Sequence, residues 1–135
     1  TPNVGSLPKF KYRIAASFDT ELLSASVTAR GTDSGKWSNL SYECTAGCPT
    51  VIATNENTVD SNHAAAAFYI DTAFTYKPMI AGTRPEFFLS VNNLLNKDPA
   101  LQPRGQGGLS GAVPTNQIIY DTLGRTYSAG VRMKF

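Results

Sequence analysis

The chain contains 135 residues, the usual size of one domain. Charged residues account for 16%, fewer than in typical soluble domains, and no apolar run approaches the about 18 residues that a membrane helix requires. The formal charge of +2 comes from scattered Lys and Arg residues, so no basic patch indicates nucleic-acid binding. This composition fits a membrane β-barrel and a soluble extracellular β-protein equally well.

Five segments show the alternation of a β-strand, in which successive side chains point to opposite faces. They span residues 9–18, 23–32, 66–77, 86–95 and 126–135. In the last of them Tyr127 and Phe135 share an apolar face, whereas Arg132 and Lys134 lie on the other face. We expect this strand to pair with the one at 86–95. No segment has a helical period of comparable quality.

The connections between these segments alternate between short and long. Residues 19–22 and 78–85 are short connections, whereas 33–65 and 94–125 are long ones. Outer-membrane barrels have short periplasmic turns and long external loops, with aromatic residues at both membrane interfaces. The aromatic residues of this chain lie near both ends of the predicted strands, so the pattern favours a barrel. A soluble β-sandwich stays open as the alternative, because its strands would bury the same apolar faces against a second sheet.

Two cysteines, Cys44 and Cys48, lie close together in the first long connection. Such a pair predicts a small disulfide loop in an oxidising compartment, with free thiols as the alternative. A metal site is disfavoured, because His63 is the only histidine and the chain has no further cysteine. We expect His63 to be a polar residue of the same connection.

Two segments carry a resemblance to a known family. FFLSVNNLLNKDP at 87–99 and YDTLGRTYSAGVRMKF at 120–135 resemble the C-terminal strands of TonB-dependent receptors, which are active transporters of the outer membrane. Residues 5–18 and 63–76 resemble the strands that precede them. The resemblance implies an all-β fold, an antiparallel transmembrane β-barrel of about 22 strands, of which this chain would supply the last five. On this resemblance we expect the plug domain of the family to lie outside this chain.

The resemblance also implies a function and a location. The protein would import a siderophore, cobalamin or a saccharide through the outer membrane of a Gram-negative bacterium, and it would not be an enzyme or need a cofactor. Its partners would be the remaining strands and plug of the receptor, the TonB complex, the barrel assembly machinery and outer-membrane lipid. The alternative is a soluble secreted β-sandwich that binds a carbohydrate or a protein.

Candidate site residues follow from the resemblance. The family's C-terminal assembly signal has a polar residue, a glycine and two apolar residues at fixed spacing, positions that correspond to Ser128, Gly130, Met133 and Phe135. Ligand contacts would come from external loops, where the residues able to stack or hydrogen-bond are Trp37, Asn39, Arg104, Gln106 and Asn116. For each of these five the alternative is an ordinary solvated loop residue.

The charged residues of the predicted strands are expected to face the lumen, because a charge on the lipid face costs about 2–4 kcal/mol at the bilayer midplane. They include Lys9, Lys11, Arg13, Arg30, Asp71, Lys77, Arg132 and Lys134. No catalytic or metal-binding constellation is predicted.

Overall fold

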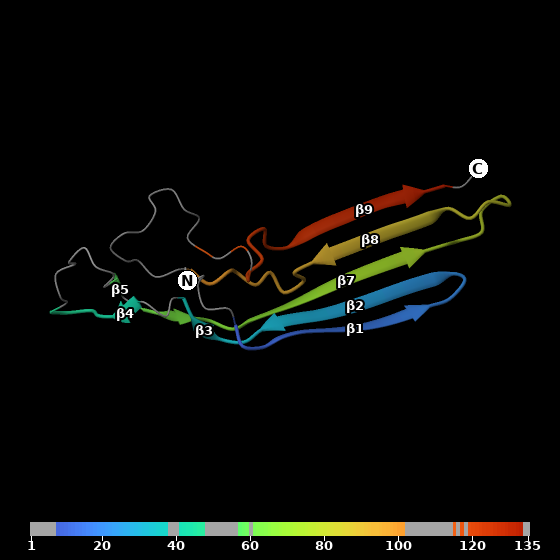
Figure 1. The fold of residues 1–135 in the computed structure, drawn as a ribbon. Coiled ribbons are helices and arrows are strands. Elements are labelled where there is room, and N and C mark those ends of the chain that lie inside the picture. The colour runs from blue at the N-terminus through green and yellow to red at the C-terminus, as the bar shows by residue number, and fades with distance from the viewer. Residues whose placement is uncertain are drawn as a thin grey trace, which may run out of the picture. The chain divides into compact units, whose positions relative to one another are not determined.

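The computed structural model describes residues 8–37, 41–47, 57–59, 61–101, 115, 117 and 119–133. All regular structure in these residues is β, which confirms that the fold is all-β (Figure 1). The chain divides into two compact units, which we call the loop unit and the sheet unit. The loop unit comprises Thr1–Lys11, Thr32–Ala67 and Pro99–Thr122, and the sheet unit comprises Tyr12–Gly31, Phe68–Asp98 and Leu123–Phe135.

One antiparallel sheet of five strands, in the order β1-β2-β7-β8-β9, organises the sheet unit (Figure 1). Its strands are β1 (Lys11–Asp19), β2 (Leu23–Thr32), β7 (Ala67–Tyr76), β8 (Glu86–Asn92) and β9 (Thr126–Arg132). Each of them overlaps one of the five predicted segments, and the predicted pairing of the last strand with the fourth is confirmed. The sheet is open and does not close into a barrel, so β1 and β9 are its edges.

The predicted strand at 86–95 is three residues too long, since β8 ends at Asn92. Asn93 and Asn96 have φ values of 53° and 51°. This left-handed backbone conformation cannot continue a strand, and asparagine is among the residues that adopt it most readily. The strand predicted at 126–135 ends at Arg132 among the described residues, and Lys134 and Phe135 lie outside them.

Strand register keeps apolar and polar side chains on opposite faces, because residues paired across strands point to the same side. Phe74 pairs with Leu89, and Leu89 pairs with Ala129. The apolar face of β7, β8 and β9 therefore contains Phe74, Tyr76, Phe87, Leu89, Val91, Tyr127, Ala129 and Val131. The polar face contains Ala73, Thr75, Glu86, Phe88, Ser90, Asn92, Thr126, Ser128, Gly130 and Arg132.

The two faces extend across β2. Arg30 contacts Tyr69 and Asp71, which alternate with the apolar residues of β7, so even-numbered residues of β2 lie on the polar face. Val27 then belongs to the apolar face, where it is 47% exposed; Leu89 is 46% exposed on that face. The sheet unit thus presents an apolar surface that its own described side chains do not cover.

Tight turns join the strands at one end of the sheet, as predicted. Between β1 and β2 the Thr20 amide donates to the Leu23 carbonyl over 2.8 Å. Between β7 and β8, Ile80 and Thr83 exchange two backbone hydrogen bonds of 2.9 Å around Ala81 and Gly82. Both central residues have positive φ, 49° and 81°, the conformation that a two-residue hairpin turn requires.

Short strands in the loop unit occupy part of the first long connection. β3 (Gly35–Lys36) pairs with β6 (His63–Ala64) antiparallel, and β4 (Ser41–Glu43) pairs with β5 (Asn57–Val59) in parallel. These strands were not predicted, because two or three residues are too few for an alternating pattern to be recognised.

Candidate functional site

A cluster of polar side chains on the polar face centres on Asp71 of β7. Arg30 of β2 donates to it from Nε over 2.7 Å and from Nη2 over 3.4 Å, and the Asn93 backbone amide donates over 2.9 Å. The guanidinium of Arg30 also lies 4.6 Å from the centre of the Tyr69 ring, which is only 2% exposed. Arg13 adds an electrostatic attraction to the same carboxylate.

The hydrogen bonds around Asp71 decide what the cluster can do. A carboxylate that accepts from three donors is held in one orientation, so its oxygens are poorly placed to take up a proton from a substrate. The cluster joins β2, β7 and the turn after β8 into one polar wall. This agrees with the expectation that Arg30 and Asp71 share a face away from the apolar one.

The turn after β8 explains the Val-Asn-Asn-Leu motif. The side chain of Asn93 is fully buried and donates to the Lys97 carbonyl over 3.0 Å, while the Lys97 amide donates back to it over 2.8 Å. Asn96 accepts a hydrogen bond of 3.1 Å from the Arg125 amide, next to Gly124 at a φ of 71°. The two asparagines therefore fix how the chain leaves β8 and how it approaches β9.

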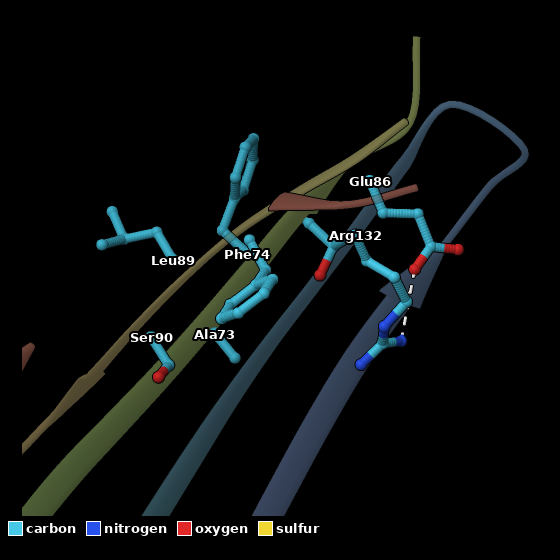
Figure 2. Close-up of a pocket in the computed structure, with 8 residues that line it drawn as sticks. Ala73, Phe74, Glu86, Leu89, Ser90 and Arg132 are labelled. Carbon is cyan, nitrogen blue, oxygen red and sulfur yellow. Dashed lines mark hydrogen bonds and ion pairs between the residues drawn. The ribbon is translucent and has the colours of Figure 1, made fainter. Parts of the chain in front are cut away.

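A shallow hollow of about 260 Å³ lies against β7, β8 and β9 (Figure 2). Glu86 and Arg132 approach to 3.3 Å at one end of it, and Leu89 lies on the opposite side of the strands from this ion pair (Figure 2). Phe88, 38% exposed, also lines the hollow and is the large apolar side chain of the polar face. Because both charges are exposed or half-buried, the ion pair contributes little to stability.

Charged residues also meet at the short turns. Lys77 lies 3.8 Å from Asp19, and Arg84 lies 3.9 Å from Glu21. These separations are long and the carboxylates are well exposed, so the pairs are weak. Each of these four charged residues therefore has an oppositely charged neighbour within the turn region.

Trp37 is the one predicted ligand residue that the structure describes, and it lies in the loop unit. Its indole Nε1 donates to the His63 carbonyl over 2.9 Å, and its ring centre lies 5.9 Å from that of Tyr120 at an angle of 52°. Tyr120 is 4% exposed and its hydroxyl donates to the Ala65 carbonyl over 2.5 Å. Trp37 therefore packs within its own unit, although it keeps some exposed surface.

The other predicted site residues are only partly described. Ser128 and Gly130 lie in β9 and Met133 directly follows it. Asn39, Arg104, Gln106, Asn116, Cys48 and Phe135 lie outside the described residues. The ligand contacts and the Cys44–Cys48 disulfide therefore stay predictions.

Sequence reasoning missed the links from Asp71 to Asn93 and from Trp37 to Tyr120. The repeated asparagines of the sequence Val91-Asn92-Asn93-Leu94-Leu95-Asn96 could have pointed to the first, because asparagine favours left-handed turns. Nothing in the local sequence signals the second.

The described residues contain no group of three or more His, Cys, Asp or Glu side chains that could bind a metal ion. Nor do they include a helix long and apolar enough to cross a membrane. No protein-family model, curated protein or solved structure matches the chain.

Proposed function

We propose that the chain supplies five strands of the barrel of a TonB-dependent outer-membrane receptor, an active importer rather than an enzyme. The observation that carries this proposal is the two-faced sheet. One face exposes large apolar side chains, such as Val27 at 47% and Val131 at 52%, and the other holds the Arg30–Asp71 pair. In a bilayer the first would contact lipid and the second the lumen, an arrangement that membrane barrels require.

The connections support the same proposal. Tight turns lie at one end of the sheet, and the long connections leave from the other end. In outer-membrane barrels the short turns are periplasmic and the long loops are external. On this basis the β1–β2 and β7–β8 turns face the periplasm, and the two long connections are external loops.

An open sheet also requires partners. An exposed backbone group in hydrocarbon costs several kcal/mol, so β1 and β9 need further strands beside them. The proposal assigns those strands to the rest of the receptor barrel, the plug to its lumen, and energy coupling to the TonB complex. The family resemblance of residues 87–99 and 120–135 is what selects this family among membrane barrels.

Site-specific fluorescence tests the placement of the two faces. In the complete protein reconstituted in lipid vesicles, a fluorophore attached at Leu89→Cys should be quenched by brominated acyl chains. The same fluorophore at Ser90→Cys should not be, because the two residues are neighbours on opposite faces. Equal quenching at both positions would contradict the proposal.

Cell fractionation tests the location. The protein should be recovered from the outer membrane and should require detergent for extraction. A detergent-independent soluble protein would instead favour a β-sandwich, in which Leu89 packs against a second sheet.

A further inference from the structure

We infer that Gly130 and Phe88 form an interlock that sets the register of β9 on β8. The two residues are directly paired on the polar face. A Cβ atom added to Gly130 would lie 2.6 Å from Cζ of the Phe88 ring and 2.9 Å from Cε1. The ring thus occupies the space where any other residue would place its side chain.

Alternation of polar and apolar residues does not define this register completely. A slip of one residue would turn apolar side chains to the polar face, but a slip of two keeps every residue on its face. In the observed register Ser90 pairs with Ser128 and Glu86 pairs with Arg132. A slip of two would bring either Ser128 or Arg132 opposite Phe88, and both of these have a Cβ atom.

Only the observed register therefore places a residue without a side chain under the Phe88 ring. This matters most for β9, which is an edge strand and pairs with β8 alone among the described strands. The turn at Asn96 and Gly124 fixes the start of β9, and the interlock acts four residues after Thr126, in the interior of the strand. A second pair repeats the arrangement, because a Cβ atom on Gly31 would overlap the Tyr12 ring.

The interlock and strand propensity predict opposite effects for the same substitution. Valine is favoured in strands and glycine weakens them, so propensity alone predicts that Gly130→Val strengthens the pairing of β9. The interlock predicts the reverse, since the new side chain displaces the ring or shifts the strand. Ala129→Val adds bulk to the neighbouring exposed position on the other face and serves as the matched control.

Disulfide cross-linking in the complete protein reads the register. Directly opposite residues can form a disulfide, whereas diagonal neighbours about 7–8 Å apart cannot do so without backbone movement. Ser128→Cys should cross-link with Ser90→Cys in the observed register and with Asn92→Cys after the slip that brings Arg132 opposite Phe88. The slip in the other direction would instead pair Ser90→Cys with Thr126→Cys. Peptide mass spectrometry identifies each cross-link separately from one formed by Cys44 or Cys48.

We expect the ratio of observed-register to slipped cross-link to fall about tenfold in Gly130→Val and to stay unchanged in Ala129→Val. Phe88→Ala combined with Gly130→Val should restore the observed register, because the ring that obstructs the new side chain is gone. An unchanged register in Gly130→Val, or failure of Phe88→Ala to restore it, would overturn the inference. If Gly130→Val alone fails to fold, the double variant with Phe88→Ala still tests the inference, because it should fold in the observed register.

Discussion

Val27 and Thr28 offer a direct test of the two faces, because they are adjacent, branched at Cβ and similar in shape. They lie at the centre of the ten-residue strand β2. Val27 belongs to the apolar face and is 47% exposed, whereas Thr28 shares the polar face with Arg30. Replacing each residue with arginine therefore places the same charge on either side of one strand.

An arginine on the lipid face near the bilayer midplane costs about 2–4 kcal/mol. Val27→Arg should lower the ratio of folded to unfolded protein roughly 30- to 700-fold, because about 1.4 kcal/mol corresponds to a factor of ten. Thr28→Arg should cost about 1 kcal/mol or less, since it faces the lumen and only adds to the positive charge of Arg30. Urea titration of the complete protein folded in lipid vesicles, followed by gel mobility, measures both values.

Equal costs for the two variants, or a larger cost for Thr28→Arg, would refute the assignment of faces. The same experiment separates a barrel from a sandwich when the lipid is varied. The cost of Val27→Arg should change with the thickness of the bilayer if this residue contacts acyl chains. A cost that is independent of lipid thickness would mean that protein covers the apolar face.

Three further substitutions test individual hydrogen bonds and the ion pair. Asp71→Asn should lower the free energy of unfolding by about 1–2 kcal/mol, because Arg30 loses its counter-charge but remains partly solvated; a double-mutant cycle with Arg30→Met measures the coupling. Asn93→Ala should lower it by about 1–3 kcal/mol and speed hydrogen exchange at the Lys97 amide, because a buried side chain with two hydrogen bonds is lost. Trp37→Phe should cost about 0.5–1.5 kcal/mol through the lost indole hydrogen bond, also measured by urea titration.

For each of these three substitutions, a different measured result would contradict the stated role of the residue. A coupling energy near zero would mean that Arg30 and Asp71 are held by solvent rather than by each other. Asn93→Gly keeps the left-handed conformation, so equal stability of this variant and the natural protein would show that the hydrogen bonds to Lys97 contribute nothing. For Trp37, a loss of ligand uptake without a loss of stability would make it a ligand contact.

The strands of the sheet could be predicted from sequence because their signal is local. In β9, Tyr127 and Val131 alternate with Ser128 and Arg132, and this pattern alone defines a strand and its faces. The end of β8 was harder to predict from the sequence. Asn93 reads as a continuation of the strand until its backbone is seen to be left-handed and its side chain bonded to Lys97.

The sequence by itself determined the strand segments, the apolar and polar faces and the alternation of short and long connections, since each depends on neighbours along the chain. The tertiary structure alone decided which residues meet across strands. Arg30 and Asp71 are 41 positions apart, and Phe88 and Gly130 meet only because β8 and β9 pair in one of several registers that alternation permits. Such contacts depend on register and strand order, and neither is encoded in a single segment.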